Sequence, residues 1–369
     1  MNFSFTEEQN LIRETARSFL AERVGSAQLR AAIGSAEGWD RALWQAIGSE
    51  MGWPGIALPE QHGGLGLGWL ELAILLEEAG RVLLPAPFLA SIGLAAPAIL
   101  VAGNPAQRAA LLPDIAAGTT VATLCLTGET GQPAPEGIAV NLFEFRLDGV
   151  ASFVLYGDTA DLLVVALGDG RFVALPAATE GVTIERLVHL DLTRPMSRIR
   201  FDRVPVAAEQ ILGSGGPTSL DRMLALGSIM LAAEQTGAAE RCLDMTVDYA
   251  KTRVQFGRVI GSFQAVKHRL ADMMVRVESA KSALYYAACA ADDASSELLE
   301  AASTASAYAG ETFLACAGEA IQLHGGIGFT WEYDAHLYFK RARADASLLG
   351  DAAHHRERIA RLIGLDREE

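Results

Sequence analysis

The feature that most constrains the fold of this chain is a double change in hydrophobic pattern, near residue 120 and again near residue 213. Outside that stretch, apolar residues recur at helical intervals. Inside it, short and partly β-branched runs are separated by Gly, Asp and Pro. A chain of 369 residues suits two or three packed modules. The pattern predicts an α+β protein: a helical domain over 1–119, an antiparallel β domain over 120–212, and a helical domain over 217–369.

Individual elements can be predicted within these modules. Thr6 precedes two acidic residues and resembles an N-cap, and the glycine-rich stretch 62–68 is interpreted as a tight turn before a helix over 69–80. It lacks the Lys-Ser/Thr of a phosphate loop, and no strand precedes it. Three later helices are predicted. The first ends near Arg253, the second runs from about Phe263 to the Tyr285 region, and the third runs from about Glu300 to Leu323. Candidate strands lie at 121–126, 153–156, 162–165, 172–175 and 196–201.

Composition excludes several classes of function. The net charge of −15 argues against wrapping nucleic acid or lying on an anionic membrane, and the apolar runs are too short for membrane insertion. The first eight residues lack the basic and apolar regions of a signal peptide. The four cysteines have no paired spacing, so we expect core thiols of a cytoplasmic protein and no bound metal.

The densest cluster of potential ligand-binding groups lies in residues 249–268, where one helix ends, the chain turns through glycines and the next helix begins. Arg253 could interact with the helix dipole or could place its planar guanidinium on a phosphate. The amides of Gln255 and Gln264 could bond a nucleotide or only a neighbouring backbone.

This segment closely resembles a signature of the acyl-CoA dehydrogenases, and so do the segments 322–336 and 58–64. The resemblance extends in order and spacing over the whole chain. It implies a C-terminal four-helix bundle, bound FAD and an acyl-CoA substrate. It also implies that cofactor-binding residues of one subunit reach the flavin of its neighbour across a dimer interface. The cofactor-binding residues implied in this way are Arg253, Gln255, Phe256, Gln264, Gln322, Gly325 and Gly326, with Leu126 and Thr127 on the β-domain side. His324, inside the glycine turn, is expected to be a packing or hydrogen-bonding residue.

The other half of the implied flavin site departs from the family pattern. The run 126–132 keeps Thr127 and loses most of the usual residues, and Phe153-Val154-Leu155 replaces a triplet that normally carries a hydroxyl. Family chemistry needs a carboxylate to remove the proton next to the thioester carbonyl. The two positions where members place that Glu hold Leu349 and Gly227 here.

Other acids and bases near these positions have competing explanations. Asp351 is the remaining candidate for the catalytic base, and Asp345 is a weaker one. Glu234, in an apolar helix, is expected to be paired structurally. The basic cluster Lys340, Arg341 and Arg343 is interpreted as a solvated helix face, although it could meet CoA phosphates.

These departures predict a subunit that completes the flavin site of a catalytic sister chain. The alternatives are a self-sufficient homomeric dehydrogenase using Asp351, a flavin oxidase, or a scaffold without flavin. The resemblance implies a dimer of dimers, made of one or two kinds of chain, and an electron-transfer flavoprotein or similar acceptor. It does not identify the acyl group.

Overall fold

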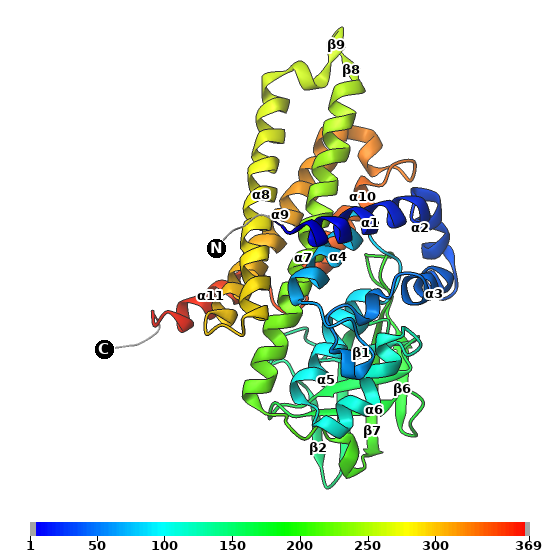
Figure 1. Ribbon diagram of the computed structural model, residues 1–369. Helices are drawn as coiled ribbons and strands as arrows, with labels where there is room; N and C mark the ends of the chain where they lie inside the picture. Colours follow the sequence, from blue (N-terminus) through cyan, green and yellow to red (C-terminus); the bar gives the residue numbers. More distant parts are fainter. Residues whose placement is uncertain (1–4, 366–369) are drawn as a thin grey trace.

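A computed structural model describes residues 5–365. Residues 1–4, which begin the segment interpreted as lacking a signal peptide, and residues 366–369 at the end of the third predicted module lie outside the described range. The chain forms a helical N-terminal part, a middle part of two packed sheets and a long helical bundle (Figure 1). The predicted α+β class is confirmed. The exact module boundaries stay predictions.

The N-terminal part begins as the sequence predicts. The Thr6 hydroxyl accepts a hydrogen bond from the Gln9 amide at 3.2 Å, and the Gln9 side chain accepts one from the Thr6 amide at 3.0 Å, so a reciprocal cap starts the first helix. A π-helical turn, Leu89–Ala95, leads into α5. The helices of this part are α1 (Glu7–Arg23), α2 (Ser26–Gly34), α3 (Arg41–Ser49), α4 (Trp69–Arg81), α5 (Ala96–Ala102) and α6 (Pro105–Ala116).

The middle part consists of two sheets, one of three strands in the order β1-β4-β5 and one of four in the order β2-β3-β7-β6. All pairings are antiparallel except β1 with β4, which is parallel and was not predicted. The strands β2 and β6 were also missed, since both are short and partly exposed. The strands are β1 (Ala122–Cys125), β2 (Val140–Phe143), β3 (Arg146–Leu155), β4 (Leu162–Ala166), β5 (Phe172–Pro176), β6 (Val182–Arg186) and β7 (Met196–Pro205).

The three-stranded sheet is buried on both faces, which explains its uninterrupted apolar runs. Leu163 and Val165 of β4 join the core between the two sheets, whereas Val164 joins the core shared with the helices. A strand covered on both sides needs apolar residues at every position and not at alternate ones. This sheet therefore fixes the β domain against the helical parts.

The C-terminal part is built on three long helices that run side by side, α7, α8 and α9, with two shorter helices that complete the bundle (Figure 1). Between α7 and α8 the chain forms a two-stranded hairpin, β8–β9, at the far end of a projecting arm. The elements are α7 (Pro217–Thr252), β8 (Val254–Gln255), β9 (Arg258–Val259), α8 (Gln264–Asp292), α9 (Leu298–His324), α10 (Ala335–Asp345) and α11 (Ala352–Leu362).

The N-terminal helix α4 crosses α7 so closely that two glycines are required. A Cβ added at Gly80 would lie 1.9 Å from the Glu234 carbonyl oxygen, and one at Gly237 would lie 1.8 Å from the Glu77 carbonyl oxygen. Because glycine lacks a Cβ, the two backbones can touch at this crossing.

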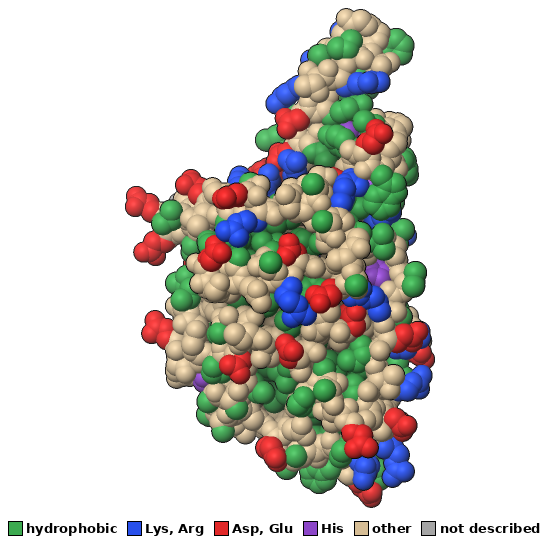
Figure 2. Space-filling model, turned by 90° about the vertical axis from the view of Figure 1, so that its right-hand side faces the viewer, with side chains coloured by type: hydrophobic (Ala, Val, Ile, Leu, Met, Phe, Trp, Pro, Cys, Tyr) green, Lys and Arg blue, Asp and Glu red, His purple; other side chains and the backbone are tan. Residues whose placement is uncertain are grey.

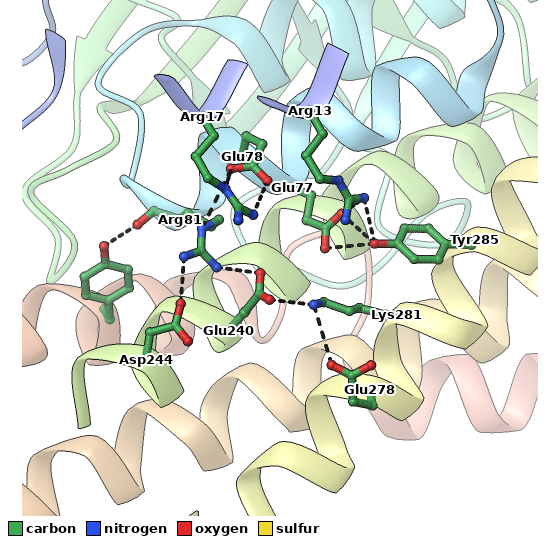
Figure 3. Close-up of polar contacts among 11 residues, drawn as sticks. Arg13, Arg17, Glu77, Glu78, Arg81, Glu240, Asp244, Glu278, Lys281 and Tyr285 are labelled. Carbon is green, nitrogen blue, oxygen red and sulfur yellow. Dashed lines mark hydrogen bonds and ion pairs between the residues drawn. The ribbon is translucent and has the colours of Figure 1, made fainter. Parts of the chain in front are cut away.

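Ion pairs surround the crossing and join four helices (Figure 3). Two buried glutamates of α4 pair with arginines of α1. Glu77 accepts from Arg13 at 2.9 Å, and Glu78 accepts from Arg17 at 2.6 Å. Arg81 contacts Glu240 of α7 at 2.5 Å. The remaining members are Asp244 on α7 and Lys281, Tyr285 and Glu278 on α8. The charged groups named here each have a partner, which attaches α1 to the bundle.

Candidate functional site

The first group of predicted ligand-binding residues lies on the arm. The backbone amide of Arg253, directly after α7, donates to the Tyr249 carbonyl at 2.8 Å, which keeps Arg253 within a turn of the helix. The hairpin then pairs Gln255 with Arg258 and turns through Phe256 and Gly257, both with positive φ.

The side chains of this hairpin face solvent. Phe256 is 91 % exposed, and Arg253 and Gln255 are also exposed. Arg258 lies over the Phe263 ring at 4.0 Å, which braces the hairpin against the start of α8, where Gln264 is exposed. In the space-filling view the arm stands out from the body and carries both hydrophobic and basic side chains (Figure 2). An exposed guanidinium with exposed aromatic and amide groups is suited to a ligand or a partner outside this chain.

The second group lies where α9 ends. Gly325 has a φ of +64°, and a Cβ added at Gly325 or Gly326 would meet nothing within 4 Å. The Gly325 amide caps α9 by donating to the Gln322 and Ile321 carbonyls, and the absence of side chains at both glycines lets a phosphate approach the exposed backbone closely. Gln322, one turn earlier, is exposed as well.

An aromatic contact brings the two groups to the same end of the bundle. The rings of Tyr249 and His324 stack with centroids 4.3 Å apart. Arg253 follows Tyr249 by one turn and Gly325 follows His324 directly. The structure therefore gathers the predicted residues of 253–264 and 322–326 at one end (Figure 1).

The remaining predicted residues line a separate cavity of about 250 Å³ between the β domain and the bundle, which we call the interdomain cavity. Leu126 and Thr127 line it, and the Thr127 hydroxyl donates to the Ser152 carbonyl at 3.3 Å. The cavity is mostly apolar, and no Asp or Glu among residues 5–365 lines it. The other lining residues are Leu94, Leu124, Thr130, Gly131, Ser152, Phe153, Leu155, Met196, Ala344, Ser347, Leu348 and Leu349.

The two positions expected to hold the base are neighbours at this cavity. A Cβ added at Gly227 would lie 3.5 Å from the Leu349 Cδ1 and 2.9 Å from the Leu94 Cδ2. Leu349 itself lines the cavity and is 8 % exposed. Two positions that are 122 residues apart in number thus meet at one place, and leucine side chains fill it.

The candidate base Asp351 lies elsewhere. Its carboxylate accepts from the His354 amide at 2.8 Å and caps α11, and the side chain is exposed. It lines a different pocket of about 310 Å³ between α9 and α11, which shares only Leu348 and Leu349 with the interdomain cavity. The structure therefore does not bring Asp351 together with Leu126 and Thr127. Its role as base stays an untested prediction.

The weaker candidate, Asp345, belongs to a buried ion-pair cluster that joins the β domain to the bundle. Arg341 donates to Asp191 at 2.6 Å and to Glu234 at 2.5 Å. Arg194 pairs with Asp345 at 2.8 Å and also with Glu234. We call these five residues the interdomain ion cluster. Burial raises the pKa of Asp345 to about 7, against the opposing effect of Arg194 and Arg341.

This cluster corrects one prediction and agrees with another. Arg341 is 1 % exposed, so its interpretation as part of a solvated helix face is wrong: α10 turns that side chain toward the loop before β7. Glu234 is paired structurally, as expected. Asp191 and Arg194 were missed, because a loop acid and an arginine before a proline carry no periodic signal. Only their contacts identify them.

Residues 5–365 contain neither a helix suited to a membrane span nor a cluster of metal ligands. In that range no helix is long and apolar enough to cross a membrane. The same residues contain no group of His, Cys, Asp and Glu arranged to hold a metal ion.

Comparison with known proteins adds a family context. Residues 6–119 match the model of the acyl-CoA dehydrogenase N-terminal domain, and residues 213–364 match that of the C-terminal domain. The sequence is 38% identical over 349 residues to the acyl-CoA dehydrogenase IpdE2 of Mycobacterium tuberculosis, covering 93% of each.

Solved structures give the same picture. The structure of the ChsE4-ChsE5 complex from Mycobacterium tuberculosis superposes with a TM-score of 0.91 at 28% identity, over 100% of both chains. A variant of the Tcur3481-Tcur3483 steroid ACAD superposes with a TM-score of 0.88 at 32% identity, over 97% of this chain and 98% of that one.

Proposed function

This chain belongs to the acyl-CoA dehydrogenase family of oxidoreductases, and from that premise we propose that it acts as the non-catalytic subunit of a heteromeric acyl-CoA dehydrogenase. In this proposal, the end of its bundle completes the FAD site of a catalytic sister chain. The reaction is the α,β-dehydrogenation of an acyl-CoA thioester. The electrons then pass to an electron-transfer flavoprotein or a similar acceptor.

The observation that carries the proposal is the meeting of Gly227, Leu349 and Leu94 at the interdomain cavity. Removing a proton next to a thioester carbonyl needs a base within hydrogen-bond reach of that proton. Neither position that could supply the carboxylate holds one, and leucine side chains occupy the space between them. A chain with this cavity lacks the group that starts the reaction.

The exposed end of the bundle, in contrast, offers groups that could bind a cofactor. FAD, when bound, supplies the hydride acceptor. The groups suited to its diphosphate are the exposed backbone of the glycine pair, Gly325 and Gly326, and the guanidinium of Arg253. All three are exposed in this chain, so another chain could bring its cofactor to them. This arrangement fits a donor of binding groups to a neighbour.

The comparisons support the same assignment. ChsE4-ChsE5 is described as a complex of two differently named chains, and Tcur3481-Tcur3483 as a steroid enzyme. By similarity, we propose a two-component assembly with a bulky acyl-CoA substrate, of which a steroid side chain is the leading class.

The test is coexpression with acyl-CoA dehydrogenase chains of the same organism that carry Glu where this chain has Leu349. We expect the purified assembly to hold flavin and to oxidise an acyl-CoA, whereas the chain alone does neither. Absorbance gives flavin per subunit, and reduction of an artificial acceptor gives turnover.

Other outcomes would identify an alternative. Turnover with stoichiometric FAD in the chain alone would establish a homomeric dehydrogenase and contradict the proposal. Hydrogen peroxide production without an acceptor would indicate an oxidase. A colourless assembly with every such sister chain would indicate a scaffold.

A further inference from the structure

Three aromatic rings from different segments stack at the exposed end of the bundle. His324 ends α9, Tyr249 lies in the last turn of α7, and Tyr333 lies in the loop before α10. The His324 ring is 4.3 Å from the Tyr249 ring and 4.5 Å from the Tyr333 ring, centroid to centroid. His324 is 3 % exposed, so the central ring is enclosed although its neighbours in sequence face solvent.

A hydrogen bond fixes the orientation of the central ring. The His324 Nδ1 lies 2.6 Å from the Ala320 carbonyl oxygen, which can only accept, so Nδ1 carries the hydrogen. The Nε2 is buried and has no partner in the described structure. Burial lowers the pKa of His324, so the ring is neutral near pH 7.

The glycine turn wraps around this ring. A Cβ added at Gly328 would lie 3.2 Å from the His324 Cβ, and the segment 325–329 forms a 3-10 turn. The Gly325 amide also donates to the Gln322 and Ile321 carbonyls, so helix capping and the packed His324 ring together set the place of the turn. On the other side, Tyr249 holds the backbone amide of Arg253 through its carbonyl at 2.8 Å.

We propose that His324 is a positioning residue that fixes the exposed Gly325–Gly326 backbone relative to the Arg253 guanidinium, so that both meet one diphosphate. This deepens the proposed function and rests on it. The two phosphate-binding segments are far apart in the chain and belong to different helices, and the stack of His324 on Tyr249 is the packed contact that links them. Binding groups held in place before the ligand arrives lose less freedom when it binds.

Three substitutions separate positioning from simple packing. H324F keeps a flat stacking ring, whereas H324L keeps apolar bulk without a planar ring. The matched control is H355L, on α11, because His355 is also 3 % exposed and has an unpartnered buried nitrogen. All three are made in the chain and copurified with the catalytic sister chain.

We expect H324L to weaken FAD binding by the intact assembly about tenfold, from the loss of two aromatic contacts. H324F should restore most of that affinity, and H355L should leave it within about twofold. Equal FAD affinity in H324L and the wild type would overturn the inference. So would a loss in H324L that H324F fails to restore, since the hydrogen bond from Nδ1 to the Ala320 carbonyl, which both variants lack, would then carry the effect and not the stacked ring.

A second measurement does not depend on the sister chain. Hydrogen exchange of the isolated chain, followed by mass spectrometry, should show faster exchange over 325–332 in H324L and wild-type exchange in H324F. Unchanged exchange in H324L would contradict the inference while leaving the proposed function standing. Absence of FAD from the wild-type assembly would instead contradict the proposed function.

Discussion

The exposed end of the bundle and the interdomain cavity hold the two halves of the predicted flavin site, and they differ in exposure and in chemistry. At the exposed end, the groups suited to a dinucleotide are the backbone of a glycine pair and one guanidinium, and they face solvent. At the cavity, Leu94 and Leu349 are buried and lie beside Gly227, where an acid was expected. In the proposed function, the first region binds the cofactor of a sister chain, and that sister chain supplies the base that is absent at Leu349 and Gly227.

The largest expected effect concerns the support of the cavity. We expect Arg341→Met to reduce the free energy of unfolding by about 3–5 kcal/mol, because it leaves Asp191 and Glu234 buried without their shared cation. Denaturant unfolding measures the change. The control is Arg343→Met, since Arg343 lies two residues along the same helix and is exposed. A loss below about 1 kcal/mol would mean that the cluster does not hold the cavity walls together.

The next effect concerns the exposed end. We expect Arg253→Ala to weaken FAD binding by the heteromeric assembly about 10- to 100-fold, the value of a charge-assisted hydrogen bond to phosphate. Fluorescence titration of the apo assembly measures it. Arg200→Ala, an exposed arginine of β7, is the control. Equal affinities would place the diphosphate elsewhere and remove the contrast between the two regions.

A smaller effect is the pH dependence of stability that Asp345, on the cavity side, contributes. Because burial raises the pKa of Asp345 to about 7, the folded chain retains a proton that the unfolded chain releases near pH 4. The stabilising contribution of this group is therefore present at low pH and is lost as pH rises from about 4 to 7.

The test is Asp345→Asn, which keeps an oxygen that can accept from Arg194. We expect the variant to lose less stability than the wild type between pH 5 and pH 8, measured as melting temperature across that range. Asp158→Asn, at the half-exposed pair with Arg186, controls for general charge effects. Parallel curves for Asp345→Asn and the wild type would show that Asp345 is ionised throughout.

The smallest expected effects are those of Asp351. Because Asp351 is the N-cap of α11, replacing it by Ala should lower the stability of the chain by about 1 kcal/mol. Replacing it by Asn, which also caps well, should have almost no effect. We expect turnover of the assembly to stay within about twofold for both variants. Abolished turnover with retained FAD in Asp351→Asn would show that this chain carries its own base, and would erase the distinction between the two regions.

Much of this architecture could be predicted from the sequence, where local pattern and local structure agree. The Thr6 cap, the helix after the glycine turn at 62–68 and the strand at 162–165 all follow from nearby residues. The short strand β2, the parallel pairing of β1 with β4 and the burial of Arg341 could not be predicted. The strand β2 is short and partly exposed, so its apolar pattern is weak, although its partner β3 follows directly. The other two features depend on partners far along the chain, and the spacing of nearby residues carries no record of those partners.

The sequence by itself determined the α+β class, the family resemblance and the absence of an acid at the positions of Leu349 and Gly227, because residue identity at a matched position needs no coordinates. Only the tertiary structure decided that those two positions meet, that Asp351 caps a helix away from the cavity, and that the His324 ring stacks on Tyr249. The physical reason is that a binding or catalytic group acts through distances of a few ångströms, and packing between helices and sheets sets those distances.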